Sequence, residues 1–116
     1  YQLSWNSCYY MGPDGKFEDH VAEMARVLKP GGWIVCSVPK ITHEILAGAD
    51  FRDDGYCIIR NDRFNLRNGE RFRWFEDREG LEVAFASHFA NFSYISIHDD
   101  FFEHNYHWHV IVAQRT

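Results

Sequence analysis

Residues Arg26 to Pro39, with the sequence RVLKPGGWIVCSVP, decide the fold class of this chain. Pro30 has no amide hydrogen and cannot continue a helix, and Gly31 or Gly32 can adopt the left-handed conformation that closes one. The six residues that follow the glycines form an almost unbroken apolar run, which is typical of a strand covered on both faces, as in a parallel sheet. The stretch therefore predicts the end of a helix, a turn, and a buried strand over Trp33–Val38.

The residues before this stretch supply the other parts of a strand-helix-strand unit. Phe17, Val21, Met24 and Leu28 recur at helical spacing in GPDGKFEDHVAEMARVL, which predicts an amphipathic helix with Asp14 as its N-terminal cap. The first residues, YQLSW, have the character of a strand. Together the three elements form one βαβ unit, whose crossover is expected to be right-handed.

The second half of the chain predicts shorter elements and then a long hairpin. THEILAGA favours a short helix, and FNLRNGERFRW alternates apolar and polar residues around Asn68-Gly69, which predicts a hairpin with a type I′ turn. A further helix after Asp77 would carry Leu81, Phe85 and Phe89 at fourfold spacing. The last 25 residues predict two antiparallel strands joined near Glu103–Asn105. The final strand is apolar on both faces at 110–113, so we expect it inside the sheet.

Composition narrows the class of protein. At 116 residues, with 46% hydrophobic and 17% aromatic residues, the chain is large enough for a single domain with a modest core. A formal charge of −5 argues against binding to nucleic acid or to an anionic membrane, because both favour a basic surface. Cys8, Cys36 and Cys57 are odd in number and lack CxxC spacing, which favours buried, reduced thiols. With no signal peptide or membrane segment visible, we expect a cytoplasmic protein.

Several motifs together resemble one enzyme family. SWNSCYYM, a following helix, RVLKPGGWIVCSVP, the NGERFRWF segment, a helix ending in FANF and a closing hairpin are similar to the C-terminal half of a class I S-adenosylmethionine-dependent methyltransferase. The family has a sheet of strand order 3-2-1-4-5-7-6 with strand 7 antiparallel. The resemblance implies an α/β fold with a partial Rossmann-like mixed sheet of family strands 4-5-7-6. Residues Tyr1–Cys8 would then hold strand 4 and Trp33–Val38 strand 5.

The same resemblance implies that residues 1–116 are the C-terminal portion of one methyltransferase domain, without its N-terminal cofactor-binding half. The family's E/D-x-G-x-G turn and its ribose-binding acidic residue have no counterpart in this sequence, and no other phosphate-binding glycine motif replaces them. The chain would supply one wall of the pocket. We therefore expect it to bind S-adenosylmethionine weakly and to be inactive alone.

The resemblance also implies where that wall lies. In open α/β sheets, ligands bind beyond the carboxyl ends of the parallel strands. Trp5, Asn6 and Ser7 would face the methionine and ribose portion of the cofactor, and Tyr10 would close over it. Trp5 and the tyrosines are equally consistent with aromatic residues of the core and its rim.

Residues after the Trp33–Val38 strand are expected to contact the methyl acceptor, a small molecule. Pro39, Lys40 and His43 follow that strand, and Tyr9 follows the first one. His43 is a weak candidate for a catalytic base, because an imidazole can accept a proton at neutral pH. The alternative is a histidine on a short surface helix. Methyl transfer requires in-line alignment more than a dedicated base.

Two clusters of charged residues each allow a functional and a simpler structural interpretation. His107 and His109 share a strand face in a hairpin rich in histidine and aspartate, which makes a metal site conceivable, but a pair between Asp100 and His109 explains the pattern equally well. Arginines interleave with aromatic residues over 60–78, although acidic residues among them favour a solvated face over a nucleic-acid site. We expect neither a metal nor a nucleic-acid partner.

Two functions remain open from the sequence. One is methyl transfer to a small molecule by a longer enzyme that includes this chain. The other is a non-catalytic domain that retains half of the fold and serves oligomerisation or binding. In either case an apolar strand edge at Leu3–Cys8 would need a cover, either from a second copy in a homo-oligomer or from an N-terminal segment.

Overall fold

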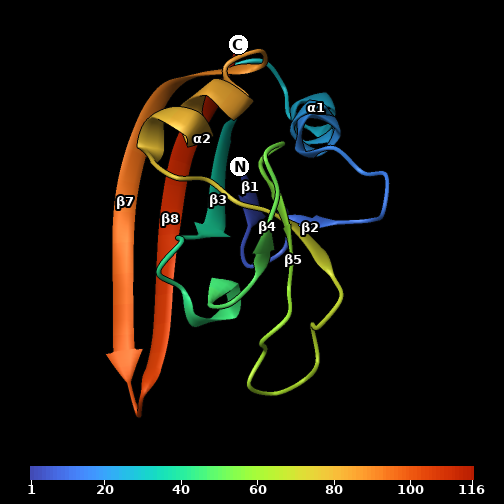
Figure 1. The fold of residues 1–116 in the computed structure, drawn as a ribbon. Coiled ribbons are helices and arrows are strands. Elements are labelled where there is room, and N and C mark those ends of the chain that lie inside the picture. Colours follow the sequence, from blue (N-terminus) through green and yellow to red (C-terminus); the bar gives the residue numbers. More distant parts are fainter.

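Two four-stranded sheets and two helices share one core in the computed structural model, which describes residues 1–116 (Figure 1). The first sheet has the order β1-β3-β8-β7, and the second has the order β2-β6-β5-β4. The elements are β1 (Gln2–Ser4), β2 (Tyr10–Met11), α1 (Phe17–Val27), β3 (Trp33–Pro39), the 3₁₀ helix η1 (Glu44–Leu46), β4 (Asp50–Phe51), β5 (Tyr56–Ile58), β6 (Arg71–Arg73), α2 (Arg78–Phe85), β7 (Phe89–Phe101) and β8 (His104–Arg115).

The first sheet is mixed, as the sequence predicted. β1 runs parallel to β3, and β8 runs antiparallel to both β3 and β7. The last strand lies inside the sheet, and its Val110, Ile111 and Ala113 are almost fully buried. β1 is shorter than the predicted Tyr1–Cys8 strand, because Asn6 has φ 58° and turns the backbone away from β3.

The two helices pack against one another by their aromatic residues. The Phe17 ring in α1 contacts the rings of Phe75 and Phe85 at centroid distances of 5.1 and 5.7 Å. Asp77 caps α2, since its Oδ1 accepts the amide hydrogen of Gly80 at 2.8 Å. The predicted Asp14 cap of α1 is wrong: α1 begins at Phe17, after Lys16, and the Phe17 amide donates to the Tyr56 hydroxyl at 2.9 Å.

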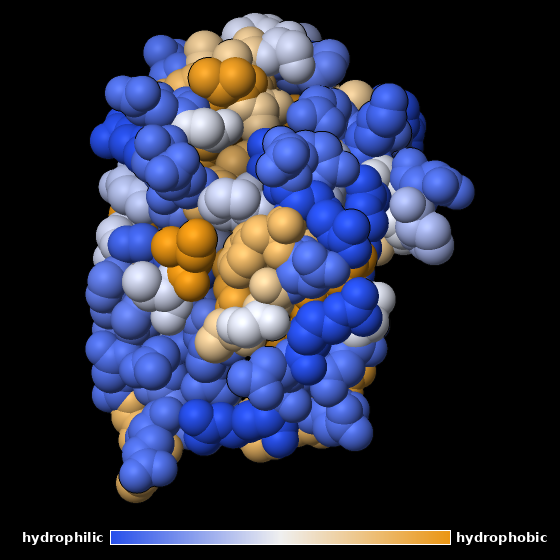
Figure 2. Space-filling view, viewed as in Figure 1, coloured by the Kyte–Doolittle hydropathy of each residue, from blue (hydrophilic) through white to orange (hydrophobic).

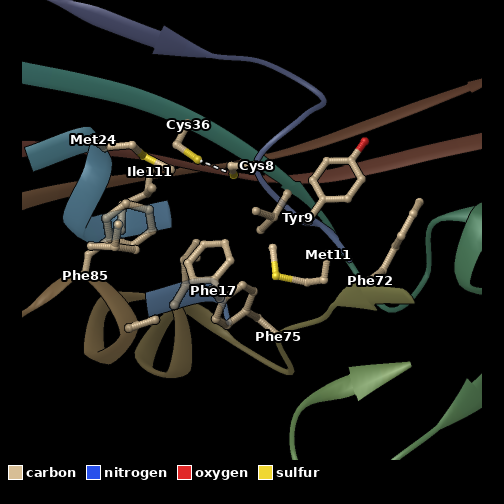
Figure 3. Packing of buried hydrophobic residues seen from close by; sticks show 14 of the residues in the cluster. Cys8, Tyr9, Met11, Phe17, Met24, Cys36, Phe72, Phe75, Phe85 and Ile111 are labelled. Carbon is tan, nitrogen blue, oxygen red and sulfur yellow. Dashed lines mark hydrogen bonds between the residues drawn. The ribbon is translucent and has the colours of Figure 1, made fainter. Parts of the chain in front are cut away.

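One hydrophobic cluster of 22 buried residues joins both sheets and both helices (Figure 3). Cys8 and Cys36 meet within it, with their sulfur atoms 2.9 Å apart, and Cys57 is also buried and unpaired. The three thiols are therefore buried, as predicted, and none forms a disulfide in this structure. Outside this core, hydrophilic side chains cover most of the face shown in Figure 2, where apolar patches are small.

The 40–77 segment differs most from the sequence-based expectation. The expected helix at THEILAGA is the single 3₁₀ turn η1. The predicted hairpin turn at Asn68-Gly69 is wrong. β6 pairs with β5, and Asn68-Gly69 lies within the long loop that connects Ile58 to Arg71, not in a two-residue turn between paired strands. Only Gly69 of the two has positive φ, whereas a type I′ turn needs both. Phe89 begins β7 instead of continuing α2. Neither α-helix has the length and hydrophobicity required to cross a membrane.

Candidate functional site

A cavity of about 970 Å³ opens at the carboxyl ends of the two parallel strands, β1 and β3. Four segments surround it: the residues after β1, the residues after β3, the loop between β5 and β6, and the end of the β7–β8 hairpin that lies low in Figure 1. These segments are far apart in the sequence, and both sheets contribute to the walls. The position is the one where open α/β sheets bind ligands.

The turn after β1 is fixed by a contact with β3. The Asn6 amide hydrogen donates to Ser37 Oγ at 2.9 Å, and this hydroxyl donates to Asn6 Oδ1 at 3.3 Å. Asparagine tolerates the left-handed conformation that Asn6 adopts, because its short polar side chain can bond locally. The Nδ2 group of Asn6 makes no hydrogen bond within the chain and remains available at the cavity.

Aromatic rings form the inner wall. Tyr9 is 4% exposed, and its ring lies 4.9 Å from Tyr10, 5.1 Å from Phe72 and 6.2 Å from Trp108 between centroids. Burial, together with the neighbouring Tyr10 hydroxyl, raises the pKa of Tyr9 far above its usual value. Tyr9 is therefore neutral at physiological pH, and this wall is flat, apolar and uncharged.

His43 lies at the start of η1, and its hydrogen bonds define its tautomer. Its Nδ1 accepts the backbone amide hydrogen of Ile45 at 3.0 Å, so Nδ1 carries no proton. Nε2 then carries the ring hydrogen, and this buried atom has no hydrogen-bond partner in the chain. The ring packs edge-on with Trp108 at 4.5 Å. Burial lowers the pKa of His43 to about 4, so the side chain is neutral at pH 7.

The loop between β5 and β6 is held by one carboxylate. Asp62 accepts the backbone amide hydrogens of Phe64, Leu66 and Arg67 at 2.9–3.0 Å. Although partial burial alone would raise it, these hydrogen bonds and the nearby Arg67 charge lower the pKa of Asp62. The result is a loop that holds Phe64, Leu66 and Arg67 at the mouth of the cavity.

Glu44 ties three of the walls together. Its carboxylate accepts the Asn105 amide hydrogen at 2.9 Å and lies 3.2 Å from His104 Nδ1 and 3.4 Å from Arg63 Nε. Burial alone would raise the pKa of Glu44, but these contacts lower it. The Glu44 charge is therefore neutralised by contacts within the chain. Arg63 pairs with it and also donates one hydrogen bond to the Glu103 carbonyl.

The structure brings five of the eight predicted site residues to this cavity: Trp5, Asn6, Tyr9, Tyr10 and His43. Ser7 instead faces a separate hollow of about 260 Å³ beside α1. Pro39 pairs with Trp108 in the sheet. The Lys40 ammonium bonds to Ser96 Oγ at 2.8 Å and to His98 Nε2 at 2.9 Å.

The sequence interpretation missed the wall formed by the 61–67 loop and the hairpin. The sequence pattern favours a solvated hairpin face for the segment that contains Phe64 and Arg67, and it assigns no role to Trp108. An aspartate followed by Asn and Gly residues was the available signal for a compact loop, since Asp side chains bond to the backbone a few residues on.

The histidine side chains of the hairpin bond to separate partners. His107 lies between Asp100 and Thr42, with Nε2 2.6 Å from Asp100 Oδ1 and Nδ1 2.7 Å from Thr42 Oγ1. His109 is buried, and its ring nitrogens bond to the Tyr94 hydroxyl at 2.6 Å and the Phe75 carbonyl at 3.3 Å. The anticipated pair between Asp100 and His109 is therefore wrong, because register places His98 opposite His107. No three His, Cys, Asp or Glu side chains converge as metal ligands would.

No family model and no curated protein matches the chain. Among solved structures, a SAM-dependent methyltransferase from Methanosarcina mazei matches with a TM-score of 0.61 at 17% sequence identity. The match covers 97% of this chain and 57% of the methyltransferase, so the chain spans little more than half the length of that protein. At this identity the likeness concerns architecture. We conclude that the chain has the α/β fold of part of a SAM-dependent methyltransferase.

Proposed function

We propose that residues 1–116 are the C-terminal portion of a methyltransferase domain that transfers a methyl group from S-adenosylmethionine to a small-molecule acceptor. The observation that carries the proposal is the cavity at the carboxyl ends of β1 and β3, lined by Trp5, Asn6 and Tyr10. In this proposal β1, β3, β8 and β7 correspond to family strands 4, 5, 7 and 6.

The residues on the β1 side fit one part of the cofactor. S-adenosylmethionine supplies a methyl group on a positively charged sulfonium. The faces of Trp5 and Tyr10 suit such a cation, because aromatic rings attract positive charge, and the free Nδ2 group of Asn6 suits the polar methionine or ribose portion. Ser7 would stabilise this turn from the side away from the cavity, where its hydroxyl lies 3.2 Å from Ser4 Oγ.

On the other side, Tyr9 and His43 would contact the acceptor, with Pro39 and Lys40 supporting the segment after β3. The geometry changes the role that we assign to His43. Because Nδ1 is occupied by the Ile45 amide and the pKa is about 4, His43 offers a hydrogen-bond donor at pH 7 instead of a base. The acceptor's proton would then leave to water, and the chain would contribute alignment.

The proposal includes weak cofactor binding by these residues alone. A glycine turn that lets the backbone approach the cofactor and a carboxylate for its ribose are absent from the sequence. Several missing polar anchors at about 1–3 kcal/mol each would weaken binding by orders of magnitude. We expect no saturable binding of S-adenosylhomocysteine to the 116-residue chain at micromolar concentrations.

Calorimetric titration of S-adenosylhomocysteine tests the proposal in the complete gene product that contains these residues. We expect one saturable site, weakened at least about tenfold in Asn6→Gly by loss of the amide contact. Glycine keeps the left-handed backbone, whereas Asn6→Ala would add strain and confuse the two effects. Absence of binding in the complete gene product, or full affinity in Asn6→Gly, would contradict the proposal.

The second candidate, a non-catalytic association domain, is favoured by the outer edge of β1. β1 pairs only with β3, and Leu3 beside this edge is 68% exposed. Unpaired strand edges are normally covered. A dimer by light scattering that Leu3→Lys converts to a monomer, together with no cofactor binding by the complete gene product, would favour this function over methyl transfer.

A further inference from the structure

The lining of the cavity specifies its ligand beyond the proposed methyl transfer, on which this inference rests. The first constraint is shape. Planar rings form the walls, and neighbouring rings contact one another at centroid distances of 4.5–6.2 Å along the series Tyr10, Tyr9, Trp108 and His43. Phe64, 57% exposed, adds an aromatic face at the mouth, where its ring stacks on His104. Such walls favour a flat, largely apolar molecule.

The second constraint is charge. The acidic groups at the cavity are largely engaged: Glu44 contacts Arg63, His104 and the Asn105 amide, and Asp62 accepts three backbone amide hydrogens. Asp99 lines the cavity from the outer part of the hairpin and is exposed to water. Exposed carboxylates are screened by solvent and bind cations weakly.

Arg67 lines the mouth of the cavity, and none of its guanidinium donors is used within the chain. Its guanidinium makes no side-chain hydrogen bond in the chain, and the nearest carboxylate oxygen, Glu70 Oε1, lies 3.8 Å away. The guanidinium carbon lies 5.3 Å from the centroid of the Tyr10 ring, which directs the group across the aromatic wall. The backbone of Arg67 is held by Asp62, so the position of this cation at the mouth is fixed by the loop. A planar guanidinium suits a carboxylate, because it can donate two parallel hydrogen bonds.

A second donor is unsatisfied deeper in the wall. His43 is 5% exposed, its Nδ1 accepts the Ile45 amide hydrogen, and its Nε2 hydrogen has no partner. Leaving such a buried donor unpaired costs about 1–3 kcal/mol, a cost that a ligand oxygen would remove once the ring turns toward the cavity. The arrangement therefore offers one charged, half-exposed donor at the mouth and one neutral donor further in.

We propose that the cavity binds a flat aromatic carboxylate, with its ring against Tyr9, Tyr10 and Trp108 and its carboxylate on Arg67. A second oxygen atom of the same molecule accepts the hydrogen of His43 Nε2. The acceptor class assigned to the methyltransferase is thus an oxygenated aromatic acid, and a cationic acceptor is disfavoured beside Arg67.

Four naphthalene probes of matched size test this assignment in the 116-residue chain, with binding measured by saturation-transfer NMR. They are 2-naphthoate, neutral 2-naphthalenemethanol, cationic trimethyl(2-naphthylmethyl)ammonium, and 6-hydroxy-2-naphthoate. We expect 2-naphthoate to bind about tenfold tighter than the neutral probe, and the cation to bind most weakly. We expect the added hydroxyl to tighten binding about fivefold further.

Two variants separate the donors. Arg67→Gln should remove the tenfold preference for 2-naphthoate. Arg52→Gln is the control, because Arg52 is exposed beside β4 and lies outside the cavity, and this variant should retain the preference. His43→Asn removes the Nε2 donor, while the asparagine Oδ1 still caps the Ile45 amide, so the fivefold gain from the hydroxyl should disappear. A thermal melt of each variant establishes that it is folded.

Tighter binding of the cation, or an unchanged preference in Arg67→Gln, would overturn the assignment of an aromatic acid. An equal gain from the hydroxyl in wild type and His43→Asn would overturn the role of His43. These probes need no methyl donor, so their failure differs from failure of the proposed function. Cofactor binding by the complete gene product without naphthoate binding would refute this inference alone, and the reverse result would refute methyl transfer alone.

Discussion

Removing the Asp62 carboxylate is expected to release the loop that forms the mouth of the cavity. Asp62→Ala deletes three hydrogen bonds to backbone amides, each at 2.9–3.0 Å. Hydrogen bonds to charged groups contribute about 1.5–3 kcal/mol, but Asp62 is only partly buried, so we take about 1 kcal/mol each. Allowing for non-additivity, the local opening free energy should fall by about 2 kcal/mol.

Amide hydrogen exchange measured by NMR checks this magnitude directly. A change of about 2 kcal/mol corresponds to roughly 30-fold faster exchange at Phe64, Leu66 and Arg67, because 1.4 kcal/mol is a factor of ten. Amides of the core strand β8 should exchange as in the wild type. Asp53→Ala serves as the control, since the Asp53 carboxylate accepts no hydrogen bond. Unchanged exchange at the three amides, or equal acceleration throughout the chain, would show that Asp62 does not hold this loop.

Three further predictions concern stability and reactivity. Asp77→Ala should lower the free energy of unfolding by about 1 kcal/mol in urea titrations, because the cap to Gly80 is lost, and an unchanged midpoint would contradict this role. Ellman's reagent at pH 8 should react with none of Cys8, Cys36 and Cys57 before unfolding, because all three are buried. The contact with Cys8 and burial raise the pKa of the Cys36 thiol, and burial raises the pKa of the Cys57 thiol to about 11. The pKa of His43 is about 4 in the folded state and about 6.5 in the unfolded state, so the unfolded state binds the proton at higher pH. His43 should therefore reduce the free energy of unfolding as pH falls from about 6.5 toward 4. His43→Asn should flatten that decline in stability, and a wild-type slope in the variant would show that other groups cause it.

The elements with strong periodicity could be predicted from the sequence. The Trp33–Val38 run indicated a strand buried on both faces. On one face Ile34, Cys36 and Val38 are at most 1% exposed, whereas Trp33 and Val35 on the other face are half-buried. The capped helix after Asp77 and the interior position of the last strand followed equally from local patterns. These features follow from the pattern of apolar residues over a few consecutive positions, which can be recognised in a single sequence.

The second sheet and half of the cavity could not be predicted, because they depend on pairings between distant residues. β2 pairs with β6 across about 60 residues, and strands of two or three residues carry little periodicity. The alternation around Asn68-Gly69 indicated a local hairpin, but Asp62 binds the backbone of the loop and separates Phe64 and Leu66 from β6. Arg67 therefore reaches the cavity through a tertiary arrangement that the sequence pattern does not show.

Amide chemical-shift mapping with S-adenosylhomocysteine, in the complete gene product that contains residues 1–116, tests whether the cavity holds the cofactor. We expect saturable shifts at Trp5, Asn6 and Tyr10 after β1, with little change around the hollow beside α1 at Met24 and Val27. Shifts confined to that hollow, or a spectrum that does not change at saturating ligand, would contradict the claim that the cavity at the ends of β1 and β3 is a methyltransferase site.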